Sequence, residues 1–230
     1  MTAPVCLLTR PEAQSRAFAA LLPGLTCVIS PVLAIVAVPF DRDLLKTAPG
    51  LVFTSANAVQ FAGPGAGRAA LCVGPQTADA ARAAGFVAKA GPGDAARLIP
   101  MLAGHEDWLH VHGRHRAREL PLRGVTAYDQ VELPLSVEAR ALLQGDAPVI
   151  LPLFSPRSAA ILARQIGAPR ASLTTVAISA RADARFHAPA ARRVIADAPD
   201  GRAMLRAIQG VVQGWGFSGG VSGTQHVPAG

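Results

Sequence analysis

The chain has 230 residues, of which 50% are hydrophobic, 16% charged and 5% aromatic. This length gives one large or two small domains, and a mean hydropathy of +0.31 excludes an intrinsically disordered protein. The 22 basic and 15 acidic residues leave a net charge of +7. A basic protein attracts nucleic acid, anionic membrane surfaces or polyanionic small molecules, and the charge alone does not distinguish among these partners.

Neither a membrane span nor a secretion signal is predicted. The longest uncharged stretch, residues 17–40, is interrupted by three prolines and a glycine, so it does not predict a membrane helix. The N-terminus lacks the basic and apolar regions of a secretory signal, which favours a cytoplasmic protein. Cys6, Cys27 and Cys72 lie in apolar runs without ligand spacing. They are interpreted as reduced core residues, with no disulfide and no metal.

Short apolar runs alternate with longer Ala-rich segments of helical spacing, which predicts an α/β protein with parallel sheets. In chain order, strands are expected at Val5–Thr9, Thr26–Ser30, Leu51–Thr54, Ala70–Val73, Phe86–Lys89, Trp108–His112, Val125–Tyr128, Val149–Phe154, Thr174–Ile178 and Arg193–Ile195, with helices between them. Two proline-marked segments, residues 31–39 and 129–134, have no helical spacing and are expected to be extended connectors.

The sequence repeats itself at an interval of about a hundred residues. Residues 53–59 return as 154–160, an offset of 101, and residues 7–11 return as 109–113, an offset of 102. Residues 72–75 likewise return as 177–180, an offset of 105. We therefore expect two copies of one doubly wound α/β unit.

The connectors predict how the two copies are threaded. The first two strands are expected to join the sheet built by the last third of the chain, while the middle of the chain builds the second sheet. Two crossing connectors would then form a hinge above a cleft. The expected segments are domain 1 (residues 1–35 and 134–212), domain 2 (40–128), linkers (36–39 and 129–133) and a glycine-rich disordered tail (213–230).

Three strand-to-helix turns carry hydroxyl or glycine residues that suit an anion. Residues 54–57 (Thr-Ser-Ala-Asn) and 155–158 (Ser-Pro-Arg-Ser) each place a serine where it can cap a helix, and residues 74–77 (Gly-Pro-Gln-Thr) open with a glycine. Turns of this kind lie at the carboxyl ends of strands, where open α/β sheets bind ligands. Each turn alone could be an ordinary helix cap, but three together favour anion binding.

These motifs, in this order and spacing, resemble the uroporphyrinogen-III synthase family over roughly residues 5–212. The matching segments are residues 8–11, 53–59, 73–75 with Thr77, Tyr128 and 154–156. The resemblance implies two flavodoxin-like doubly wound domains joined by a two-stranded linker. It also implies a monomeric enzyme that cyclises hydroxymethylbilane, a linear tetrapyrrole with eight carboxylates, by losing water and inverting ring D. The family needs no cofactor.

The resemblance also assigns roles to residues. It implies that Tyr128 is catalytic, since a neutral phenol can bind the departing hydroxyl or orient a pyrrole; the alternative is a strand residue with a solvated hydroxyl. The substrate-binding residues expected are Arg10, Thr54, Ser55, Asn57, Gly74, Gln76, Thr77, Ser155, Pro156, Arg157, Ser158, Ser179 and Arg181.

One segment departs from the family pattern. Residues 179–182 read Ser-Ala-Arg-Ala, where the family usually has Gly-Pro and paired threonines, so hydroxyl donors are missing although Arg181 could bind a carboxylate bidentately. This departure motivates an alternative function, a non-catalytic anion-binding or regulatory module of the same fold. A nucleic-acid binder is motivated only by the charge and lacks interleaved aromatic residues, so neither nucleic acid nor membrane is an expected partner.

The histidines and the basic run after them leave further alternatives. His105, His110 and His112 pair with no recognisable nucleophile and are interpreted as structural or surface residues. The run from Arg114 to Arg118 either faces the cleft or forms a solvated surface.

Overall fold

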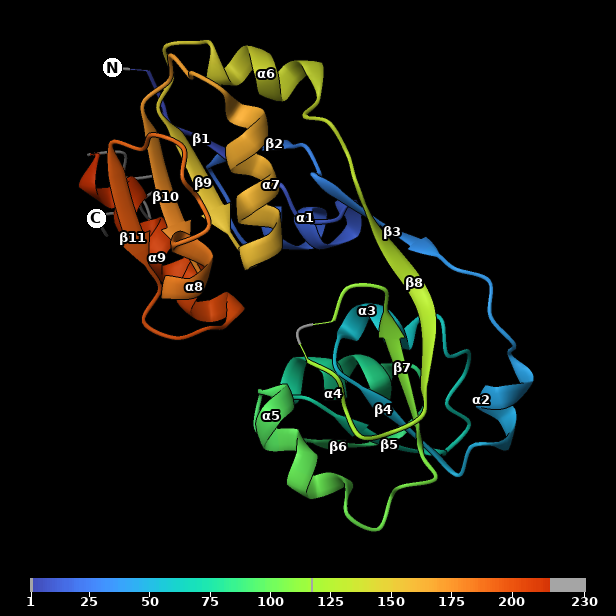
Figure 1. Cartoon of the computed structure of the whole chain (residues 1–230). Helices are drawn as coiled ribbons and strands as arrows, with labels where there is room; N and C mark the ends of the chain where they lie inside the picture. Colours follow the sequence, from blue (N-terminus) through green and yellow to red (C-terminus); the bar gives the residue numbers. More distant parts are fainter. Residues whose placement is uncertain (1, 117, 216–230) are drawn as a thin grey trace, which may run out of the picture. The chain divides into compact units, whose positions relative to one another are not determined.

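The structure is a computed structural model that describes residues 2–116 and 118–215 (Figure 1). These residues form two compact units. Unit 1 runs up to Ala34 and resumes at Glu132, and unit 2 is Ile35–Val131. In chain order the elements are β1 (Val5–Leu8), α1 (Glu12–Ala19), β2 (Thr26–Ile29), β3 (Leu33–Ala37), α2 (Asp43–Thr47), β4 (Gly50–Phe53), α3 (Ala56–Val59), β5 (Ala69–Cys72), α4 (Pro75–Ala83), β6 (Val87–Ala90), α5 (Ala95–Leu98), the 3-10 helix η1 (Ile99–Leu102), β7 (Leu109–Gly113), β8 (Gly124–Glu132), α6 (Val137–Leu143), β9 (Val149–Leu153), α7 (Pro156–Ile166), β10 (Leu173–Ala177), α8 (Ala180–Asp183), β11 (Arg192–Ile195) and α9 (Gly201–Gly214).

The sheet of unit 1 combines strands from both ends of the described chain. Its order is β2-β1-β9-β10-β11 and all neighbouring pairs are parallel. Val5 of β1 pairs with Thr26 of β2 on one side and with Val149 of β9 on the other. Counted along the chain this is the flavodoxin-like order 2-1-3-4-5. The expectation that the first two strands join the sheet of the last third is confirmed.

The sheet of unit 2 repeats this arrangement. Its order is β8-β7-β4-β5-β6, with β3 added beside β8. The strands β7, β4 and β5 occupy the positions of β1, β9 and β10 in the first sheet, and the pairs β4·β5, β4·β7, β5·β6 and β7·β8 are parallel. The two sheets therefore share one topology, as the internal repeat predicts, and the doubly wound α/β fold is confirmed.

Helices cover both faces of each sheet. Successive side chains along a strand point to opposite faces, so neighbouring residues pack against different helices. In unit 1, Leu7 packs into the core beneath α6, α7 and α8, whereas its neighbours Cys6 and Leu8 pack into the core beneath α1 and α9. In unit 2, Phe53 packs beneath α2, α3 and α4, whereas Val52 packs against α5 and η1. Each central strand is thus buried on both faces, which is why most of its residues are apolar.

The structure also corrects the expected boundaries. All ten expected strands are present, but β8 continues to Glu132 instead of ending at Tyr128, because it pairs with β3. The first connector contains a further strand, β3, which is hydrogen-bonded to β8. The expected tail from residue 213 is wrong at its start, because Gln213 and Gly214 close α9; residues 216–230 lie outside the described residues. In the described part of the chain, no helix has the length and apolar character of a membrane span.

Candidate functional site

The candidate residues gather at the carboxyl-terminal edge of each sheet. In unit 1, Arg10 follows β1, Ser155 follows β9 and Ser179 follows β10. In unit 2, Thr54 follows β4 and Gly74 follows β5. Because the carboxyl ends of parallel strands share one edge, each unit carries its own set of candidate residues there.

The turn after β9 forms the capped N-terminus of α7. Pro156 occupies the first turn of α7, and the Ser155 Oγ accepts a hydrogen bond from the Ser158 backbone N–H at 3.1 Å. The Ser155 and Ser158 hydroxyls lie 2.7 Å apart, within hydrogen-bond distance. Ser158 is buried, and Arg157 lies in the same first turn. The amides and hydroxyls of this turn are thereby held in fixed positions.

Arg10 lies beside this turn because β1 and β9 are neighbours. Its guanidinium carbon is 4.3 Å from the centre of the Phe154 ring, and its Nε donates to Gln14 Oε1 at 3.1 Å. Burial lowers the pKa of Arg10, but a guanidinium remains charged at neutral pH. The structure thus brings together a cation and the Ser155 turn, which are 145 residues apart in sequence.

The turn after β10 leads into a shorter helix. The Ser179 Oγ accepts from the Ala182 N–H at 3.3 Å and caps α8, which has four residues. Arg181 is exposed. The turn therefore lacks the second hydroxyl that Ser158 gives to the turn after β9, as its sequence indicates.

In unit 2 the turn after β4 is tied to a neighbouring strand. The Ser55 Oγ accepts from the Asn57 N–H at 3.2 Å, and the Thr54 Oγ1 lies 2.9 Å from Nε2 of His110 on β7. His110 is 1% exposed, and burial, followed by the nearby His112, lowers its pKa to about 3. At neutral pH His110 is an uncharged imidazole that holds the Thr54 hydroxyl.

In the turn after β5, the glycine at position 74 is explained by backbone packing. A Cβ at Gly74 would lie 3.0 Å from the Gly93 Cα, so the absent side chain makes room for another backbone segment rather than for a ligand alone. Thr77 is buried in α4, whereas Gln76 is exposed. Of the residues expected here, Gln76 is therefore the one whose side chain is open to solvent.

Tyr128 is buried at the carboxyl edge of unit 2. It pairs with Gly113, the last residue of β7, and stacks on Phe61 with ring centres 5.5 Å apart. Burial raises the pKa of the Tyr128 phenol, and a hydrogen bond with the Ser55 side chain opposes the rise. The phenol is therefore protonated at neutral pH, and it lies next to a candidate binding residue rather than being a solvated strand residue.

Sequence analysis interpreted His110 as a structural or surface residue and missed its bond to Thr54. The available signal was the alternation Leu109-His110-Val111-His112, which places both imidazoles on one face of a buried strand. His112 is also buried, and its Nδ1 lies 2.9 Å from the Gly113 carbonyl oxygen. His105 is partly buried, and its ring lies against Trp108 in a tilted arrangement with ring centres 4.2 Å apart.

Two arginines of the basic run after β7 form ion pairs within unit 2. Arg114 Nε lies 2.8 Å from Asp129 Oδ2, and Arg116 lies 2.8 Å from Glu119. Cys6, Cys27 and Cys72 are free thiols. In the residues that the structure describes, no cluster of three or more His, Cys, Asp or Glu side chains could hold a metal ion.

Comparisons with known proteins identify a family and a shared fold. A family model described as "Uroporphyrinogen-III synthase HemD" matches residues 19–206. A solved uroporphyrinogen-III synthetase from Helicobacter pylori is 14% identical with a TM-score of 0.61, and the alignment covers 92% of this chain and 100% of that one. A mutant uroporphyrinogen III synthase from the extremely thermophilic bacterium Thermus thermophilus is 17% identical with a TM-score of 0.53, covering 92% and 99%. At these identities the likeness is one of fold. No curated protein sequence matches the chain.

Proposed function

This chain belongs to the uroporphyrinogen-III synthase family, and from that premise we propose that it cyclises hydroxymethylbilane with loss of water and inversion of ring D. The observation that carries the proposal is the family match over residues 19–206, on a chain whose strand ends hold serine-capped turns suited to anions. The protein would act as a cytoplasmic monomer without a cofactor.

The proposed reaction makes a specific demand on the protein. Hydroxymethylbilane also closes without inversion, so the protein must favour one folded conformation of a reactive chain, which is catalysis by positioning. Fixed donors suit this task better than mobile ones. The Ser155 and Ser158 hydroxyls and the Arg10 guanidinium are held by contacts within unit 1, and Thr54 is held by His110 in unit 2.

The substrate's carboxylates are the proposed ligands of these turns. An exposed helix N-terminus stabilises an anion by about 0.3–1 kcal/mol, so one turn is too weak to position a tetrapyrrole. Several must act together, with Ser55, Asn57, Gly74, Gln76 and Thr77 in unit 2 and Pro156, Arg157, Ser179 and Arg181 in unit 1 completing the proposed set. The buried Thr77 would then act through its backbone amide.

Tyr128 is the proposed proton donor or orienting group for the departing hydroxyl. It is protonated at neutral pH and its ring is clamped by Phe61, so its hydroxyl has a defined position beside Ser55. The substitution Tyr128→Phe removes the hydroxyl and keeps the stack. We expect a loss of turnover of about a hundredfold or more, the usual contribution of a general acid; turnover unchanged within about twofold would remove Tyr128 from the mechanism.

The alternative of a non-catalytic module rests on the turn after β10. Ser179 uses its acceptor on its own helix and no second hydroxyl supports it. The assay that separates the two functions supplies hydroxymethylbilane and measures the ratio of type III to type I uroporphyrinogen. The enzyme gives an excess of type III, whereas the module leaves the spontaneous type I product. Tight, salt-sensitive DNA binding would instead favour a nucleic-acid protein.

A further inference from the structure

A cationic pocket lies in unit 2, at the end of the sheet opposite Thr54 and Gly74. Its volume is approximately 410 Å³, and its lining residues come from α2 and from the loop that precedes β5: Arg42, Leu45, Lys46, Ala62, Gly63, Pro64 and Arg68. The segment of α2 leads into β4 and the loop leads into β5, and these strands are parallel neighbours. The pocket therefore lies at the amino-terminal edge, away from the candidate residues described above.

The lining itself is positive, although Asp41 and Asp43 flank Arg42 in the sequence. Three of the seven lining residues are cations and none is acidic. Lys46 Nζ lies 2.7 Å from Asp43 Oδ1, but both side chains are more than three-quarters exposed, so this ion pair is weak. Within the described residues, neither Arg42 nor Arg68 forms an ion pair with a carboxylate.

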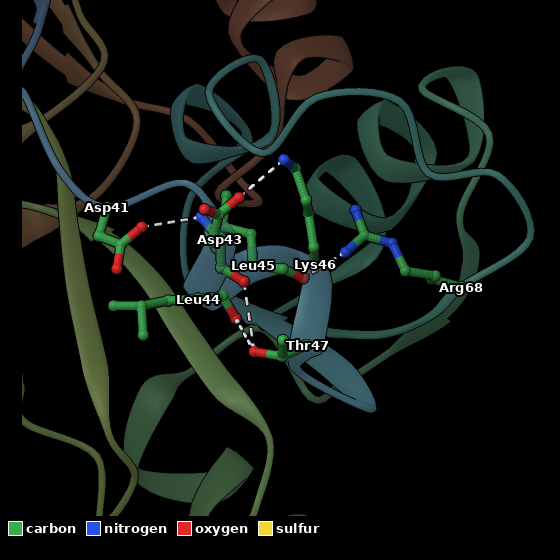
Figure 2. A network of polar contacts seen from close by, with 7 residues as sticks. All are labelled: Asp41, Asp43, Leu44, Leu45, Lys46, Thr47 and Arg68. Atoms are coloured by element: carbon green, nitrogen blue, oxygen red, sulfur yellow. Dashed lines mark hydrogen bonds and ion pairs between the residues drawn. The ribbon is translucent and has the colours of Figure 1, made fainter.

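Arg68 is the fixed member of the pocket. Its Nη1 donates to the Leu45 carbonyl oxygen at 2.6 Å, its Nε to Gly65 at 3.3 Å and its Nη2 to Pro64 at 3.4 Å. Figure 2 shows the guanidinium reaching α2 beside Lys46. A guanidinium has five N–H donors, so these three bonds leave two for another acceptor. The side chain is thus held in place before any ligand arrives, which lowers the entropy cost of binding.

We propose that this pocket binds a small phosphate-bearing anion. A single carboxylate needs one arginine, whereas a phosphate group carries nearly two charges and three strong acceptor oxygens and is matched by a fixed guanidinium with two further cations. Leu45, Ala62 and Pro64 give the pocket an apolar wall for a non-polar part of the ligand. The site is independent of the proposed tetrapyrrole chemistry.

The two lysines of the chain allow a direct test in the unmodified protein. Lys46 lines the pocket, whereas Lys89 is exposed on β6 of the same unit and serves as an internal control. The protein is treated with an amine-reactive acylating ester, and the rate at each lysine is read by peptide mass spectrometry. Pyrophosphate and inorganic phosphate are added at constant ionic strength, with acetate as the monoanion comparison.

We expect pyrophosphate to slow acylation of Lys46 and to leave Lys89 unchanged. For a Kd near 1 mM, about 10 mM pyrophosphate slows Lys46 about tenfold by mass action. Arg42→Gln should weaken this protection. Arg97 is an exposed residue of the same unit that does not line the pocket, so the control Arg97→Gln should leave the protection unchanged. Equal protection of both lysines, or equal protection by acetate, overturns the proposal because it shows only charge screening; so does no protection at all.

The proposal and the proposed enzyme activity fail separately. Arg42 and Lys46 are outside the proposed tetrapyrrole site, so Arg42→Gln should leave the type III to type I ratio unchanged. A protein that shows Lys46 protection but makes no type III product supports the pocket and refutes the synthase. A changed isomer ratio in Arg42→Gln would assign the pocket to tetrapyrrole binding and overturn its independence.

Discussion

A single added methyl group at Gly113 tests how tightly the protein holds Tyr128. A Cβ at this position would lie 2.6 Å from both Cε2 and Cζ of the Tyr128 ring and 3.0 Å from its hydroxyl oxygen. Carbon atoms in good contact are about 3.5–4.0 Å apart, so the ring would have to move by roughly 1 Å. Tyr128 is only 2% exposed and is stacked on Phe61, so it has little room to move.

Overpacking of this kind costs about 1–3 kcal/mol. With a urea m-value of about 1–3 kcal/mol/M, Gly113→Ala should lower the unfolding midpoint of unit 2 by an amount on the order of 1 M. The two tryptophans make the units separable, because Trp108 lies in unit 2 and Trp215 in unit 1. In a Trp215→Phe background, tryptophan fluorescence reports on unit 2.

The same substitution elsewhere in the chain provides the control. Gly210 lies within α9, and a Cβ there would meet nothing within 4 Å. Gly210→Ala should therefore stabilise unit 1 by about 0.5–1 kcal/mol through helix propensity and a less flexible unfolded chain, read from Trp215 in a Trp108→Phe background. An unchanged midpoint and m-value for Gly113→Ala would show that the ring is not confined, and the argument for a fixed Tyr128 hydroxyl would fail.

Two further predictions concern a helix cap and a buried histidine. Ser155→Ala and Ser136→Ala each remove an N-cap in unit 1. Urea unfolding should show that each lowers the free energy of unfolding by about 1 kcal/mol. Only Ser155→Ala should lower the proportion of type III product. Burial lowers the pKa of His110 to about 3. Between this value and pH 6.5, the imidazole is protonated in the unfolded chain and neutral in the folded chain. The stability of unit 2 should fall from pH 7.5 to pH 5, with His110 contributing at most about 1.4 kcal/mol per pH unit below pH 6.5 and His112, whose pKa burial also lowers, adding to the fall. His110→Gln should therefore reduce this dependence without abolishing it.

The sequence predicted the elements well because their signals are local. Residues 5–8 and 149–153 are continuous apolar runs, and residues 173–177 are apolar apart from two threonines; burial on both faces of a sheet favours such segments. The internal repeat added the topology, since two copies of one unit are expected to share one strand order. The extent of β8 was underestimated because strand ends depend on pairing with β3, which lies about 90 residues earlier in the chain.

The contacts that give the candidate site its geometry could not be predicted in the same way. Thr54 meets His110 because β4 and β7 are parallel neighbours in which Val52 pairs with His110, a register set by packing over more than fifty residues of chain. Gly113 meets Tyr128 only across a register shift between β7 and β8. Likewise, Gly74 is adjacent to Gly93 rather than open to a ligand. All three contacts depend on how strands distant in sequence are aligned. Local patterns in a single sequence do not predict that alignment.

The structure also changes how helix capping and anion binding relate to each other. Ser55, Ser155 and Ser179 all cap their own helices, but a hydroxyl that accepts one bond still has its own proton to donate. Capping therefore orients a hydroxyl without using its proton, but Ser55 also bonds the Tyr128 side chain and Ser155 also bonds the Ser158 hydroxyl. Thr54 differs, because its partner is a neutral imidazole. If His110 donates from Nε2, the Thr54 proton is free for a carboxylate; if Nε2 accepts, that proton is already used. The tautomer of His110 thus determines whether Thr54 can serve as an anion donor.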